Sequence, residues 1–287
     1  MNDEDSAPLP QIDAAQAVEV ITGFIGAQMA QTGFSRVVVG LSGGVDSATT
    51  AFLAVRATGA DKVLAVRMPY RTSSPESEAD ALAVVEVLGC QTERVDISPM
   101  VDPMLALISG DEEATRVRRG NVMARQRMIV LYDRSAAFDA LVIGTSNKTE
   151  ALLGYGTLWG DMAAAIQPIG DLYKSQLRAV AECLGVPERI LVKPPSADLW
   201  PGQTDETELG ASYDDLDRIL YALVDRRWSQ DRCVRAGLDA ALVARVAATV
   251  ARMEFKRQVP PVAKVSLRTP GIDHLYPRRR PGSRRSG

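Results

Sequence analysis

The residues best suited to do chemistry lie in the segment Ser42-Gly43-Gly44-Val45-Asp46-Ser47, which follows the apolar residues 37–39. A strand that turns through serine and glycine into a helix presents free N–H groups and the positive end of the helix dipole, which together bind phosphate. Asp46 would repel a phosphate there unless a divalent cation lay between them, and Mg²⁺ prefers such oxygen ligands. The segment is not a Walker A loop, because no Gly-Lys-Ser/Thr follows at the required spacing. A turn that merely packs a helix against a strand is the alternative, and the six matched positions favour the phosphate site.

A second polar segment, residues 145–150 (TSNKTE), directly follows the apolar residues 140–144. Glu150 could supply a second carboxylate to a metal held by Asp46. Taken alone, these residues are explained equally well as a polar loop with a helix cap. The single histidine, His274, lies near the C-terminus among prolines and arginines, so carboxylates and phosphate are the expected metal ligands, and Mg²⁺ the expected metal.

Apolar periodicity predicts the elements that would position these residues. Strands are expected at residues 36–41, 62–68, 92–97 and 140–144, and helices at 11–32, 46–57, 75–88 and 111–138. Further helices are expected at 173–184, 213–225 and 238–255. The alternation predicts an α/β fold, with a doubly wound, mostly parallel sheet, helices on both faces and additional C-terminal helices. Because ligands bind beyond the carboxyl ends of parallel strands, the two polar segments should meet there.

Composition excludes several classes of protein. The net charge of -3 argues against nucleic-acid binding, and no apolar run is long enough to span a membrane. Three separated cysteines predict neither disulfides nor a zinc site, and we expect a cytoplasmic protein. We expect a disordered N-terminus at residues 1–10, one domain over 11–276, and a basic flexible tail at 277–287.

The glycine-rich segment is the signature of ATP pyrophosphatases of the PP-loop family, and the motifs that follow make the whole chain resemble NAD synthetase. They are TSNKTE at 145–150, GYGTLWGD at 154–161, DLYK at 171–174, PSADL at 195–199, QTDE at 203–206, FKR at 255–257 and PP at 260–261. Together with the phosphate loop they cover roughly residues 37–261.

The resemblance implies a reaction. The family transfers AMP from ATP to the nicotinate carboxylate of deamido-NAD (nicotinic acid adenine dinucleotide), and ammonia then displaces AMP to give NAD. A carboxylate resists attack by an amine until its oxygen becomes a leaving group, and charge develops on phosphate in both steps. Catalysis should therefore come from positioning and electrostatic stabilisation, which requires no nucleophilic Cys or His. The resemblance also implies a homodimer with deamido-NAD at the subunit interface, and residues 111–138 could contribute to it or simply pack in the core.

The resemblance also assigns residues. Asp46 and Glu150 are implied as Mg²⁺ ligands, and Lys174 as the cation that neutralises departing pyrophosphate, against the alternative of a surface lysine in a helix's first turn. The implied ATP contacts are Gly40, Leu41, Ser42, Gly43, Gly44, Val45, Asp46, Ser47, Arg67, Thr145, Lys174 and Ser196. The implied deamido-NAD contacts are Arg125, Leu158, Asp161, Phe255 and Lys256. Arg125 shares a helix face with Asn121, four residues earlier, and a solvated arginine-rich face is the alternative there.

Three positions depart from the common ammonia-using enzymes, which have Lys, Asp and His where this chain has Leu158, Ala165 and Phe255. The same loop with an aromatic before Lys-Arg resembles archaeal members and the synthetase domain of glutamine-using members, and Asp161 is expected to take over part of the missing acid's role. Only 36 residues precede Val37, too few for a glutaminase domain, so we expect free ammonia or a separate glutaminase subunit. The alternatives are another PP-loop enzyme acting on a different carboxylate, and a non-catalytic nucleotide-binding protein of the same fold.

Overall fold

The computed structural model describes residues 7–107, 112–196, 198–200 and 202–273. Four parallel strands form one sheet in the order β3-β2-β1-β4. They are β1 (Arg36–Gly40), β2 (Val63–Arg67), β3 (Gln91–Arg94) and β4 (Ala140–Ile143). Since Val38 pairs with Leu64 on one side and Val142 on the other, β1 is central. The predicted α/β class is confirmed.

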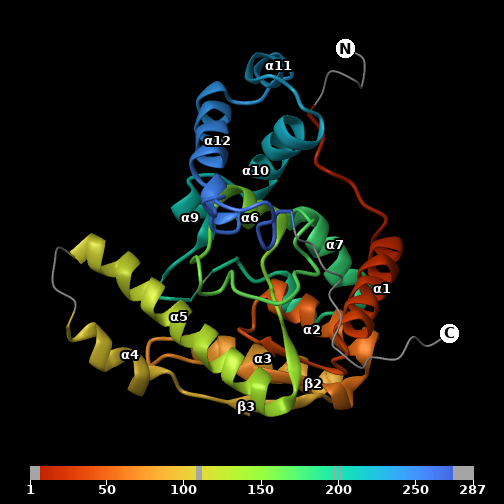
Figure 1. Ribbon diagram of the computed structural model, residues 1–287. Coiled ribbons are helices and arrows are strands. Elements are labelled where there is room, and N and C mark those ends of the chain that lie inside the picture. The colour runs from red at the N-terminus through yellow and green to blue at the C-terminus, as the bar shows by residue number, and fades with distance from the viewer. Residues whose placement is uncertain (1–6, 108–111, 197, 201, 274–287) are drawn as a thin grey trace.

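Helices cover both faces of this sheet (Figure 1). Val37 and Val39 pack in one core with α1 (Ala14–Thr32), α2 (Val45–Thr58), α3 (Pro75–Leu88) and α7 (Lys174–Leu184). Val38 points the other way, into a second core with α4 (Ser98–Leu105) and α5 (Glu112–Phe138). This alternation is the two-residue period of a strand whose both faces are buried.

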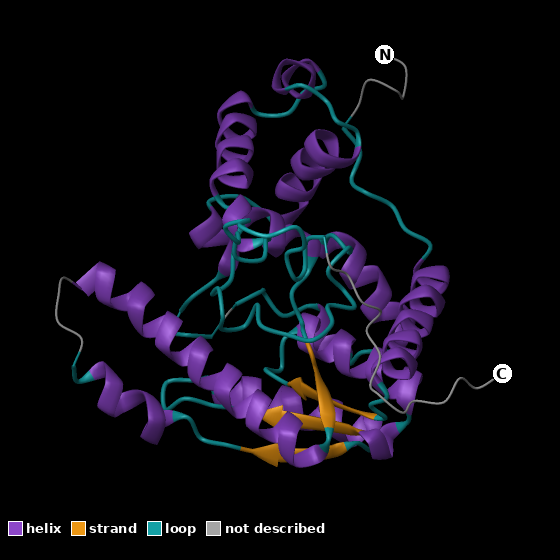
Figure 2. Ribbon diagram, viewed as in Figure 1, coloured by secondary structure: helices purple, strands orange, loops and turns teal. Residues whose placement is uncertain are grey.

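A helical cluster lies beyond the carboxyl ends of the strands, at the top of Figure 2. It contains α10 (Tyr213–Leu220) with its π turn (Tyr221–Asp225), α11 (Gln230–Arg235), α12 (Ala240–Arg252) and the 3₁₀ turn Glu254–Lys256. Leu153 of α6 (Lys148–Leu153) packs into the same apolar core. The remaining short elements are a 3₁₀ turn at Ala60–Lys62, α8 (Glu188–Leu191) and α9 (Asp205–Leu209).

Several boundaries differ from the predictions. The predicted helix at 238–255 is two elements, α12 and the 3₁₀ turn, and the third strand is shorter than the predicted 92–97. α4, α6, α8, α9 and α11 were not predicted, because helices of four to eight residues are too short to show an apolar period. α4 also has Pro99 in its first turn and Pro103 in its interior, and such prolines make the sequence pattern look like a break.

The predictions for the two ends fall largely outside the described residues, which omit 1–6 and 274–287. Residues 7–10 form neither helix nor strand, and Ala7 is buried against the C-terminal helical cluster. Within the described parts of the chain, no helix is long and apolar enough to cross a membrane.

Candidate active site

The glycine-rich loop lies where β1 ends and α2 begins. Gly43 has a φ of 82°, and a Cβ there would lie 2.2 Å from the carbonyl oxygen of Ser77, so no larger residue fits without moving backbone. Ser47 Oγ donates to Gly44 O over 3.0 Å and accepts the N–H of Ser42 over 3.2 Å. The N-cap of α2, Gly44, provides no side-chain cap, so the first-turn N–H groups face the cleft as an anion site.

Three charged side chains meet beside this loop, and we call them the charged centre: Asp46, Glu150 and Lys174. Lys174 Nζ donates to Asp46 Oδ2 and lies 3.3 Å from Glu150 Oε1. Asp46 Oδ1 accepts a hydrogen bond of 2.7 Å from Nδ2 of the buried Asn147. Lys174 is only 1% exposed, so it is not the surface lysine that the sequence left open.

The charges of this centre are strongly coupled. Burial and the charge of Asp46 raise the pKa of Glu150 to about 8, although Lys174 opposes the shift. Burial favours neutral Lys174, but Asp46 and Glu150 outweigh it and raise the pKa of Lys174, so the ammonium stays charged at neutral pH. A buried ion pair contributes little net stability. The residues are therefore better explained by what they bind.

The donor set fits a hard divalent cation. Two carboxylates that face one ammonium present the oxygen ligands that Mg²⁺ takes from a protein, and Mg²⁺ usually completes its shell with water and substrate phosphates. Among the described residues, no group of three or more His, Cys, Asp or Glu side chains could hold a metal without such help. A cation here would be shared between protein and nucleotide.

A buried hydrogen-bond relay fixes the charged centre. Thr149, beside Glu150, accepts the backbone N–H of Lys174 at its Oγ1 over 3.0 Å. The same hydroxyl donates to Asp217 Oδ1 over 2.5 Å, and Asp217 Oδ2 accepts the N–H of Ser175 over 2.8 Å. Thr149 and Asp217 are fully buried. The relay thereby joins α6, α7 and α10 at the first turns of α6 and α7, which carry Glu150 and Lys174.

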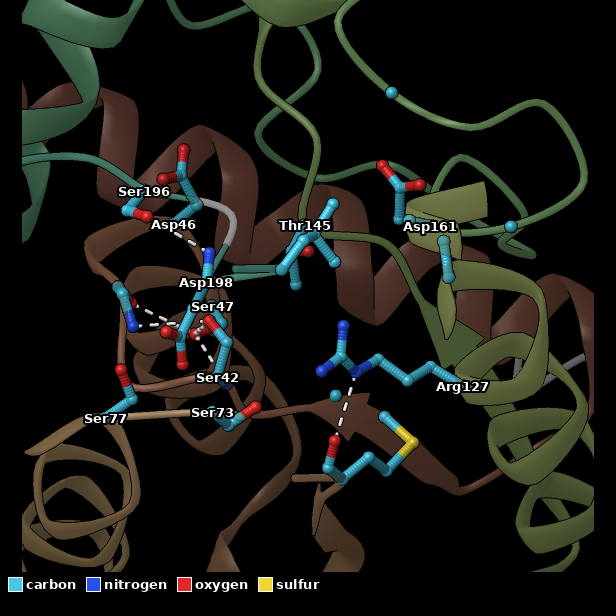
Figure 3. Close-up of a pocket in the computed structure, with 18 of the residues that line it drawn as sticks. Ser42, Asp46, Ser47, Ser73, Ser77, Arg127, Thr145, Asp161, Ser196 and Asp198 are labelled. Atoms are coloured by element: carbon cyan, nitrogen blue, oxygen red, sulfur yellow. Dashed lines mark hydrogen bonds between the residues drawn. The ribbon is translucent and has the colours of Figure 1, made fainter. Parts of the chain in front are cut away.

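The charged centre opens into a cleft of about 990 Å³. Of the predicted ATP contacts, all but Gly43 line it, and Gly43 lies against Ser77 beneath the loop. Figure 3 shows Ser42, Asp46, Ser47, Thr145 and Ser196 around this space. Ser196 Oγ accepts the N–H of Asp198 over 3.1 Å. The carboxylate of Asp198 in turn accepts the N–H of Ser74, which ties the two walls together.

Arg67 lies at the β2 end of the cleft and is held in place by neighbours. Its Nη1 donates to Glu78, and its Nε donates to Thr92 over 3.1 Å. These contacts leave the side chain as a fixed part of the wall.

The predicted acceptor contacts divide into two groups. Asp161 and Lys256 line the cleft at the outer loop, residues 154–161. Lys256 Nζ donates to the carbonyl oxygens of Gly154 and Gly156, each over 2.7 Å, and Asp161 Oδ1 accepts the N–H of Thr157.

The second group comprises Arg125, Leu158 and Phe255, which do not line the cleft. Arg125 is exposed and donates to the carbonyl of Leu158 over 3.2 Å, and Phe255 is 59% exposed. Ala165, the third departure from the common pattern, packs against the core, and its N–H donates to the carbonyl oxygen of Val142 in β4.

Sequence reasoning missed Arg127. Its Nε donates to Met68 O over 3.0 Å, and its guanidinium lies in the cleft. The cleft-lining face of α5 has the alternating three- and four-residue spacing of one helix face, comprising Val117, Gly120, Asn121, Ala124, Arg127, Met128 and Leu131. Counting along that stripe from Asn121 leads to Arg127.

A tyrosine–carboxylate cluster beside Lys174 was also missed. Tyr155 and Tyr213 donate to the two oxygens of Asp205 over 3.0 and 3.1 Å, and Tyr155 also bonds Glu208 over 2.8 Å. Burial raises the pKa of Asp205, which the charge of Lys174 opposes. Only the QTDE motif pointed toward this cluster.

A parallel sheet with an anion-binding loop at β1, two carboxylates and a buried lysine defines the class of ATP pyrophosphatases with a PP-loop. The sequence matches the family described as NAD synthase over residues 17–260. The NH(3)-dependent NAD(+) synthetase of Chlorobium phaeovibrioides is 52% identical over 91% of this chain and 93% of that protein. The chain belongs to the NAD synthase family, as its motifs predicted.

Solved structures agree with this assignment. The NH3-dependent NAD synthetase of Campylobacter jejuni, in complex with the nitrate ion, has a TM-score of 0.74 and 34% identity, covering 88% of this chain and 100% of that one. The NMN synthetase of Francisella tularensis has a TM-score of 0.76 and 30% identity, covering 88% of this chain and 99% of that one.

Proposed function

We propose that this chain catalyses the ATP-dependent amidation of deamido-NAD with ammonia, giving NAD, AMP and pyrophosphate through an adenylated nicotinate carboxylate. The observation that carries the proposal is the buried Lys174 between Asp46 and Glu150, beside the phosphate loop, in a chain that belongs to the NAD synthase family. The match to two NH(3)-dependent NAD(+) synthetases covers more than nine-tenths of the length of each of those proteins.

The geometry supports a mechanism by positioning. The N–H groups at the start of α2 bind the ATP phosphates, and the charged Lys174 stabilises the negative charge that develops as pyrophosphate leaves. The acceptor carboxylate attacks the α-phosphorus, and ammonia then attacks the acyl carbon while AMP departs. Asp46 and Glu150 would hold Mg²⁺, which neutralises phosphate charge when bound.

Acceptor binding would be completed by a second copy of the chain. Exposed apolar side chains on α5 outside the cleft, including Ile129 and Tyr132, are suited to a dimer contact. Arg125 and Phe255, which lie outside the cleft, would then contact deamido-NAD near that interface.

The direct test supplies ATP, Mg²⁺ and ammonium with deamido-NAD and measures NAD and AMP. We expect equal amounts of both. Nicotinic acid mononucleotide is supplied in parallel, because the NMN synthetase of Francisella tularensis shares the fold. Faster turnover of the mononucleotide would reassign the acceptor, and no product with either acceptor would refute the amidation. Replacing ammonium by glutamine should abolish product unless a separate glutaminase is added.

A further inference from the structure

Arg127 is a cation of the cleft wall that the reaction outlined above does not yet use. In Figure 3 it extends from α5 into the cleft, with Thr145 nearby and Ser42 and Ser47 of the phosphate loop on the opposite side. Its Nε donates to the carbonyl oxygen of Met68, directly after β2, over 3.0 Å. This bond fixes one edge of the guanidinium and directs the two terminal nitrogens toward the space that the nucleotide would occupy.

Those terminal nitrogens have no hydrogen-bond partner among the residues that the structure describes. Asp161 and Asp198 stabilise the charge only at a distance, while burial lowers the pKa of Arg127. A guanidinium that is partly desolvated and incompletely paired costs free energy, so its retention in the wall indicates a ligand that supplies the missing acceptors. A purely structural arginine would instead use its terminal nitrogens within the fold.

The chemistry of the free nitrogens indicates the ligand. A guanidinium presents parallel N–H donors that match the paired oxygens of a phosphate or a carboxylate. Both groups meet in this cleft during adenylation: the α-phosphate of ATP and the carboxylate of the acceptor.

We propose that Arg127 is an oxyanion-binding residue of the reacting centre, which holds paired oxygens of the α-phosphate or of the acceptor carboxylate. The inference rests on the proposed function and adds a specific residue to it. It also distinguishes Arg127 from Arg125, which is exposed and bonds to the outer loop.

The test compares Arg127→Gln and Arg127→Lys with wild type. Binding of a non-hydrolysable ATP analogue and of deamido-NAD is measured separately by calorimetry, together with kcat and KM. The control is Arg134→Gln, on the same helix but outside the cleft, where Arg134 pairs with Glu93. We expect Arg127→Gln to lower kcat/KM by about 10- to 100-fold, because a hydrogen bond to a charged group is lost. Arg127→Lys should lose less of kcat/KM than Arg127→Gln but should not reach the wild-type value, because lysine keeps the charge but not the paired donors.

Each outcome has one interpretation. Weaker binding of the ATP analogue alone identifies the α-phosphate, and weaker binding of deamido-NAD alone identifies the carboxylate. A loss of kcat with both affinities intact places the contact in the transition state. Wild-type kinetics and affinities in both variants would overturn the proposal, and if Arg127→Gln does not fold, Arg127→Lys decides alone. If the wild type binds ATP but makes no NAD, the proposed function fails, while the ATP-analogue measurement still tests Arg127.

Discussion

On the phosphate side of the cleft the charged groups are buried or half-buried, bonded to one another and fixed through three helices, whereas on the outer side they are held by backbone contacts between loops. Lys174, Glu150 and Asp46 form one charged centre, fixed by the relay from Thr149 to Asp217. Lys256 instead reaches two carbonyl oxygens of the outer loop, and Phe255 beside it is exposed.

The difference shows how one fold can keep its chemistry while its acceptor varies. A charged group that is positioned by buried partners cannot change without disturbing α6, α7 and α10 together. A loop that is held through main-chain oxygens accepts many side chains. The departures at Leu158 and Phe255 from the common ammonia-using pattern lie on this second side.

The largest effect is expected from Lys174→Met. Because the ammonium stabilises charge on the departing pyrophosphate, kcat should fall by about 10²- to 10³-fold. Steady-state NAD formation measures this, with Lys62→Met on the surface as the control. A folded Lys174→Met protein with kcat near that of the wild type would show that the charged centre does not serve catalysis.

A second effect concerns the cation. Glu150→Gln should raise the Mg²⁺ concentration needed for half-maximal rate by more than about tenfold, because one of the two carboxylates that would bind the metal becomes a neutral amide. Mg²⁺ titration after chelation measures the shift, and Glu182→Gln, on the side of α7 away from the cleft, serves as the control. An unshifted titration would remove Glu150 from the metal site.

The relay predicts a smaller loss. Thr149→Val keeps the shape of the side chain but removes the hydroxyl, so kcat should fall about tenfold and the free energy of unfolding by about 1–3 kcal/mol. Thr149→Ser should restore both, since it keeps the hydroxyl. If Thr149→Val lowered the free energy of unfolding without changing kcat, the relay would stabilise the fold but would not position the charged centre.

The smallest effect is expected on the outer side. Lys256→Met should raise the KM for deamido-NAD by a few-fold and leave the KM for ATP unchanged. The increase is small because water partly replaces the hydrogen bonds that the charged lysine makes. Steady-state kinetics with each substrate varied separates the two. A larger change in the KM for ATP would show that the two sides are not independent.

The sheet and its order of elements could be predicted, because strands buried on both faces are continuous apolar runs and the long helices show their period. The phosphate loop and Glu150 followed from their place after such strands. The burial of Lys174 could not be predicted, since a lysine in a helix's first turn is ordinarily solvated, and here its partner Asp46 lies 128 residues earlier. Nor could the place of Arg127 in the cleft wall be predicted before the direction of α5 against the sheet was known.

Exchange of labelled pyrophosphate into ATP, measured without ammonium, reports whether this cleft adenylates the acceptor carboxylate. We expect exchange that requires both Mg²⁺ and deamido-NAD and that Lys174→Met abolishes. Exchange that proceeds without deamido-NAD, or no exchange in an enzyme that binds both substrates, would contradict it.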